Sequence, residues 1–246
     1  MRLPKKITPD RIRESIVQVF IQSRIPFDPL VGYLFRILEE MGFAYTNKPL
    51  KKPSNLVPGN PPKVLEFNFA PQHLFFNEQV KIQLTDGSLI FNCLEQYIGW
   101  SNYGEIIRKV LDQLHSQGVI SSFGRVGVRY ISEFPNTDIF NQINFQFNLS
   151  ALKKPLKSGN FRMMWVDDPH RIILNLGTNL NIQPIVDKSG TKGEHLSLID
   201  VDVIREFETN SPLASFTVIE EVHLKQKEIF FNILKEEFLN TLNPEY

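Results

Sequence analysis

The sequence predicts an α+β fold in which antiparallel sheets are covered by helices on one face. Short β-rich segments separated by turn signals fill most of the chain, and three amphipathic helical segments lie among and after them. Runs of strands closed by helices are typical of antiparallel sheets rather than of a doubly wound parallel sheet. We expect two consecutive β-rich halves, 1–134 and 135–246, either as two domains or as one, with a long helix closing the chain.

The first helix is expected at residues 28–41. Asp28 is an N-cap candidate, Pro29 occupies the favoured first helical position, and Gly42 follows as the C-terminal stop. One apolar stripe connects these signals, formed by Leu30, Val31, Leu34, Phe35, Leu38 and Met41.

Two further helices are expected from capping-box spacings. Asn102 and Glu105 begin a helix over 102–117, which Gly118 ends. Thr217 and Glu220 have the same spacing and begin the longest helix, which we expect to continue to a stop near residue 244.

Strands are expected between the helices. An Asp-Gly pair joins 79–84 to 88–97, and it predicts a hairpin turn whose two central residues both have positive φ. A longer loop, 167–170, joins 161–166 to 171–176 in a second hairpin. The segment 14–23 also fits a helical stripe, but its β-branched residues favour a strand. The other predicted strands are 65–69, 125–132, 142–149 and 198–207, and long loops are predicted at 46–62 and 183–194.

Composition narrows the classes of function. The 246-residue chain has 27 basic and 27 acidic residues, so its net charge gives no support for a nucleic-acid partner, although it leaves one open. Cys93 is the single cysteine, which rules out an intrachain disulfide or multi-cysteine metal site and favours a reducing compartment. No apolar run approaches the ~20 residues of a spanning helix, so we expect a cytoplasmic protein with no membrane partner. Nucleotide-binding and hydrolase motifs are missing, and we expect no cofactor.

Asp200 and Asp202 are candidate catalytic residues. Two positions apart on a strand, they share a face, and paired carboxylates can hold Mg²⁺ or act as acid and base. Alternation alone also explains them as the wet face of a strand whose other face holds Ile199, Val201 and Val203.

Arg125 and Arg129 are candidate ligand-binding residues. They flank Gly127 on one face of a strand, where two guanidinium groups could clamp a phosphate or a carboxylate. An ion pair with Asp200 or Asp202 on an adjacent strand would use the same arginines structurally, and we favour this alternative.

His223 is a third catalytic candidate, near the edge of the last helix's apolar stripe. Its only helical acid neighbour is Glu220, so a packing role is the favoured interpretation. The other histidines lack metal-ligand spacing and no metal site is expected. A buried thiol is the favoured interpretation of Cys93.

Three segments resemble a known family. Residues 6–17 (KITPDRIRESIV), 125–131 (RVGVRYI) and the tail from Ile219 through EEVHLKQKEIFF are similar to a sporadically distributed bacterial family of uncharacterised proteins of about this length, and 198–203 (LIDVDV) matches its pattern. That family usually has Asn where this chain has Ser132. The resemblance implies a gene that moves horizontally, as defence and toxin–antitoxin components do.

The preferred hypothesis is a non-catalytic interaction or regulatory protein, a component of a mobile bacterial defence or toxin–antitoxin module. Its expected partner is a protein, with homo-oligomerisation as one form of association. Two alternatives stay open: a divergent metal-dependent phosphodiesterase or nuclease that uses Asp200 and Asp202 with Arg129, and a sensor that holds a small anionic, nucleotide-like ligand between Arg125 and Arg129.

Overall fold

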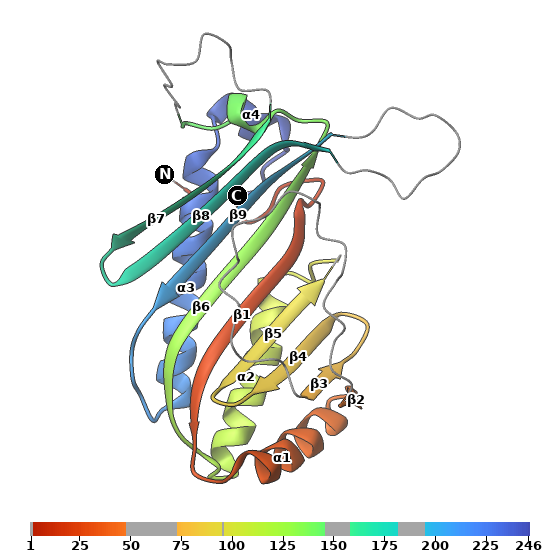
Figure 1. Cartoon of the computed structure of the whole chain (residues 1–246), viewed down its shortest axis with the longest axis vertical. Coiled ribbons are helices and arrows are strands. Elements are labelled where there is room, and N and C mark those ends of the chain that lie inside the picture. The colour runs from red at the N-terminus through yellow and green to blue at the C-terminus, as the bar shows by residue number, and fades with distance from the viewer. Residues whose placement is uncertain (1, 48–72, 95, 146–157, 182–194) are drawn as a thin grey trace. The chain divides into compact units, whose positions relative to one another are not determined.

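The computed structural model describes residues 2–47, 73–94, 96–145, 158–181 and 195–246 (Figure 1). The described residues form an α+β fold with a nine-stranded antiparallel sheet and four α-helices, which confirms the predicted class. The strands are β1 (Ile12–Ser23), β2 (Ala44–Thr46), β3 (His73–Phe76), β4 (Val80–Thr85), β5 (Ser88–Leu94), β6 (Ile120–Pro135), β7 (Gly159–Asp167), β8 (His170–Asn181) and β9 (His195–Arg205). Their order in the sheet is β2-β3-β4-β5-β1-β6-β9-β8-β7.

The chain divides into two compact units, each built from several segments. The first unit comprises Met1–Arg13, Arg129–Val203 and His223–Tyr246, and the second comprises Glu14–Val128 and Ile204–Val222. A boundary after residue 134, as the sequence analysis drew it, lies inside β6. Strands β1, β6 and β9 each contribute residues to both units.

In the second unit, two helices pack together beside the strands: α1 (Phe27–Glu40) and α2 (Trp100–Ser116). Alternate residues of β5, Leu89, Phe91 and Cys93, are buried, as expected for a strand that is covered on one face. The buried Tyr103 of α2 donates its hydroxyl hydrogen to the carbonyl oxygen of Phe91 over 2.8 Å. This bond fixes α2 against the strands while satisfying a buried polar group.

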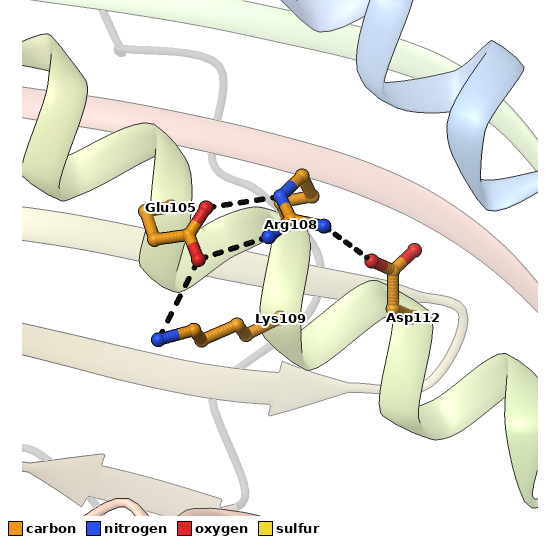
Figure 2. A network of polar contacts seen from close by, with 4 residues as sticks. All are labelled: Glu105, Arg108, Lys109 and Asp112. Atoms are coloured by element: carbon orange, nitrogen blue, oxygen red, sulfur yellow. Dashed lines mark hydrogen bonds and ion pairs between the residues drawn. The ribbon is translucent and has the colours of Figure 1, made fainter.

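The outer face of α2 carries a network of charged side chains (Figure 2). Arg108 donates two hydrogen bonds of 2.9 Å to the carboxylate of Glu105 and a third, of 3.1 Å, to Asp112. The Glu105 carboxylate therefore pairs with Arg108, and the hydrogen bonds from Arg108 lower the pKa of Glu105. The predicted capping box at Asn102 is wrong, because the helix begins at Trp100 and Asn102 donates its side-chain amide to the carbonyl of Ile98.

In the first unit, helices cover one face of the strands. The Tyr130 ring of β6 lies 5.8 Å from the His223 ring, and the Phe134 ring lies 5.7 Å from that of Phe238. His223 belongs to α3 (Pro212–Ile233) and Phe238 to α4 (Glu236–Thr241). Because side chains alternate along a strand, Arg129 lies on the opposite face. We call this the helix-free face, because no α-helix in the described part of this unit covers it (Figure 1).

The long C-terminal helix starts earlier than the sequence analysis predicts. Its first residue is Pro212, and the Ser211 hydroxyl oxygen accepts a 3.3 Å hydrogen bond from the backbone N–H of Ala214, as an N-cap does. Thr217 lies inside the helix, where its hydroxyl donates to the carbonyl of Leu213. The predicted capping box at Thr217 is therefore wrong, since the Ser-Pro signal upstream is the one that acts.

The same helix also ends earlier than expected, at Ile233. The backbone N–H of Lys235 donates to the carbonyl of Gln142, and the side-chain amide of Asn144 donates to the carbonyls of Asn232 and Leu234. These bonds satisfy groups that a continuing helix would use internally, so the chain breaks and restarts as α4.

Most predicted strands are present, with some corrections. The ambiguous segment 14–23 is strand β1, while β2 and β3 were not predicted. The prediction of a strand over 142–149 is wrong at 142–145, where a turn and an isolated bridge between Ile143 and Leu234 follow the 3-10 helix Ile139–Asn141. Residues 146–149, the strand 65–69 and the loop 183–194 lie outside the described residues, as does the loop 46–62 apart from Thr46, which ends β2, and Asn47.

Both predicted hairpins are present, but their turns differ from expectation. In the β4–β5 hairpin only Gly87 has a positive φ, of 95°, whereas Asp86 does not. The β7–β8 loop is shorter than predicted, since Asp167 pairs with His170 and leaves only Asp168 and Pro169 between the strands.

Two glycine substitutions test how the backbone determines these elements. Gly87→Ala should lower the free energy of unfolding by about 1–2 kcal/mol, because a side chain is strained at a positive φ. Gly32→Ala, inside α1 with no atom within 4 Å of the added Cβ, should raise it by about 0.5–1 kcal/mol. Denaturant unfolding of the two variants measures both changes, and effects of the same sign would contradict this account.

Candidate functional site

A polar cluster on the helix-free face of the first unit joins three strands. Arg129 of β6 donates to both carboxylate oxygens of Asp200 of β9, each over 2.8 Å, and Asn175 of β8 donates to Asp200 over 2.8 Å. The Asp200 side chain is only 9% exposed. The favoured ion-pair interpretation of Arg129 is thereby confirmed.

This cluster limits what Asp200 can do chemically. Its two carboxylate oxygens accept three hydrogen bonds, two of them from a positively charged guanidinium in bidentate geometry. A metal ion or a substrate proton would have to displace these donors. Asp202, two residues along β9, is half-buried and makes polar interactions of its own.

Arg125 lies in the second unit and has different partners from those of Arg129. Its Nε lies 3.9 Å from a carboxylate oxygen of Glu206, and its guanidinium lies 5.1 Å from the centre of the Phe20 ring. The second contact is within the range of a cation–π interaction. The two arginines singled out as a clamp therefore each have partners within their own unit.

His223 is buried in α3 with its ring beside Tyr130. Burial lowers the pKa of His223 from 6.5 to about 3, and the positive charge of Lys227 acts in the same direction. The imidazole is therefore neutral at physiological pH. Its surroundings correspond to the packing role that the sequence analysis favoured.

Cys93 is buried in β5, in accordance with the favoured interpretation, and its thiol donates to the carbonyl of Gln96 over 3.6 Å. Among the residues that the structure describes, no three His, Cys, Asp or Glu side chains come together in a group that could hold a metal ion.

A hollow between α1 and α2 has a volume of about 230 Å³ and is lined by polar side chains that include Arg36, Glu40 and Gln113. This is smaller than the roughly 300–1,000 Å³ typical of small-molecule sites.

The exposed surface of β7 was not predicted from the sequence. Met164 and Val166 are 66% and 72% exposed on the helix-free face, and Trp165 is 38% exposed on the other face. The available signal was the uninterrupted apolar run from Met163 to Val166, because a strand with one solvent-facing side normally alternates with polar residues. Large apolar side chains exposed together mark interaction sites.

An ion pair connects the end of this strand to α3. Lys225 lies 2.8 Å from Asp167 and 3.2 Å from Glu228. The hydrogen bond from Lys225 lowers the pKa of Asp167, and the same bond raises the pKa of Lys225. The β7–β8 hairpin is therefore attached to a helix while its apolar side chains stay exposed.

No protein-family model matches this chain, and comparison with curated proteins gives no significant match. In the part of the chain that the structure describes, no helix has both the length and the apolar character needed to cross a membrane.

Removing one member of the polar cluster should destabilise the first unit. Asp200→Ala leaves the Arg129 guanidinium, 25% exposed, without its main partner, and should lower the free energy of unfolding by about 2–4 kcal/mol. Asn175→Ala removes one neutral donor and should cost about 1 kcal/mol. Chemical denaturation of both variants gives the comparison, and equal small losses would contradict a structural role for the ion pair.

The buried His223 should make stability depend on pH. Because its pKa is about 3 in the folded protein and 6.5 when unfolded, the unfolded chain binds the extra proton between these values. The contribution of the neutral His223 to the free energy of unfolding is complete above pH 6.5 and is lost as the pH falls towards 3. We compare the free energies of unfolding of wild type and His223→Asn. Their difference, wild type minus variant, should decrease by up to about 1.4 kcal/mol for each unit by which the pH falls in this window. A constant difference would show that the imidazole is accessible to protons in the folded state.

Proposed function

We propose that this chain is a non-catalytic interaction or regulatory protein that binds a protein partner through the exposed edge of its β7–β8 hairpin. The observation that carries the proposal is the exposure of Met164 and Val166 on a strand at the end of the sheet order. Exposed apolar residues on an edge strand are characteristic of β-strand addition, in which backbone hydrogen bonds supply affinity and side chains supply specificity.

The polar residues that would support the nuclease and anion-sensor alternatives have structural partners. A metal-dependent nuclease needs a carboxylate available to its ion, but Asp200 is engaged by Arg129 and Asn175. An anion sensor needs free guanidinium groups, and Arg129 is held in a bidentate ion pair. Both alternatives would require these contacts to break, so the interaction function is favoured over them.

The resemblance in residues 6–17, 125–131, 198–203 and the tail from Ile219 supports a wider proposal. We propose that the chain belongs to the sporadically distributed bacterial family described above and acts in a mobile defence or toxin–antitoxin module. A protein–protein contact made through an exposed edge strand is compatible with a role as a component of such a module.

A tagged pull-down from the native host tests the interaction function. We expect a nuclease-resistant, stoichiometric protein partner with wild type, and recovery reduced about tenfold or more by the double change Met164→Lys and Val166→Lys, which places charge in a desolvated contact. Mass spectrometry and nucleic-acid sequencing of the eluates provide the readout.

Leu213→Lys is the matched control. Leu213 is 73% exposed, much like Val166 at 72%, but it lies at the start of α3 in the second unit. This variant should retain the partner. Equal recovery with the double variant and wild type, or recovery of nucleic acid in place of a protein, would refute the proposed binding surface.

A further inference from the structure

The outer edge of β7 offers a regular row of backbone hydrogen-bonding groups. β7 pairs with β8 in nine consecutive register steps without a bulge, and it is the last strand in the sheet order of the described residues (Figure 1). The hairpin closes at Asp167 and His170 across a two-residue loop. Because antiparallel ladders alternate, the odd-numbered residues bond to β8, and the N–H and C=O groups of residues 160, 162, 164 and 166 point outward.

The residues of β7 itself lack the features that normally prevent strands from pairing. Protected edges carry proline, several lysines or a bulge. β7 contains no proline or lysine, and Arg162 is its only charged residue before Asp167, whose carboxylate is paired with Lys225. The edge is therefore competent to add a strand.

We infer that the occupant of this edge is the β7 strand of a second copy of the chain, paired antiparallel about a twofold axis at Met163. Met163 is the midpoint of Gly159–Asp167, so this register alone pairs the strand over its full length. It also makes the outward-pointing residues face one another, with 162 opposite 164 and 160 opposite 166 of the second copy. The inference rests on the proposed function and names its partner.

The side chains of β7 are complementary to themselves in this register. Phe161 of each copy lies opposite Trp165 of the other on the helix-covered face, and aromatic cross-strand pairs are among the stabilising ones. Arg162 lies opposite Met164, so the two arginines do not face each other directly. A register centred one residue earlier would place Arg162 opposite Arg162. The chain's equal numbers of acidic and basic residues, 27 each, add no net repulsion between copies.

Cysteine substitutions in β7 test the register. Met163→Cys lies on the proposed twofold axis at a non-hydrogen-bonded pair, where Cα atoms are about 4.5 Å apart, and should form a disulfide-linked dimer under mild oxidation. Phe161→Cys and Trp165→Cys should each crosslink poorly with themselves but well with each other when mixed. Wild type, whose only cysteine is the buried Cys93, provides the baseline on a non-reducing gel.

Charge changes at Met164 test the same register without crosslinking. Met164→Lys places a cation opposite Arg162 of the other copy, whereas Met164→Glu places an anion there. Because the twofold axis repeats the pair, we expect the Lys variant to dimerise about tenfold more weakly than the Glu variant. Arg162→Glu combined with Met164→Lys should restore dimerisation. Sedimentation velocity over a range of concentrations measures all of these variants.

Three outcomes would overturn the inference: a purified protein that stays monomeric at every soluble concentration, a dimer indifferent to the sign of the charge at residue 164, or equal self-crosslinking at positions 161, 163 and 165. A monomer whose pull-down partner is still lost with Met164→Lys and Val166→Lys would leave the proposed function standing with a different protein as partner. Retention of that partner by the double variant would instead refute the proposed function itself.

Discussion

The burial of alternate side chains beneath α3 and α4 determines the arrangement of the first unit. Tyr130 and Phe134 contact these helices, and Ile172, Leu174, Ile199 and Val201 are buried in the neighbouring strands. Once these side chains are covered by the helices, the residues between them along each strand must lie on the other face. Arg129, Asp200 and Asn175 are placed there together, and because a partly buried charge without a partner is costly, each satisfies the others.

This constraint changes the meaning of residues that look catalytic in the sequence. Carboxylates two residues apart and arginines around a glycine are common in metal and phosphate sites, but they are equally the residues that join neighbouring strands by ion pairs. The bidentate geometry of Arg129 on Asp200 favours the structural role. His223 follows the same logic, since burial keeps its imidazole neutral beside Tyr130.

At the β7 end of the sheet, in contrast, apolar side chains are exposed. β8 is buried along most of its length, whereas β7 keeps large apolar side chains in solvent and has unpaired backbone groups on its outer side among the described residues. The ion pair between Lys225 and Asp167 holds the end of this strand in place. A strand that is already ordered loses little conformational entropy when it pairs with another, so its backbone edge and apolar side chains both favour association.

Features that depend on residues close together in the chain could be predicted from the sequence. The first helix, the two hairpins and the α+β class all follow from local periodicity and turn chemistry. The first helix nevertheless spans Phe27–Glu40 instead of 28–41, and its N-cap is Pro26, so the predicted cap at Asp28 is wrong. The three-dimensional fold was needed to show that α3 ends where Asn144 caps it, that Arg129 pairs with Asp200, and that β7 lies at an exposed edge among the described residues. These features join residues far apart in the chain, and periodicity tells which side chains share a face but not what lies against it.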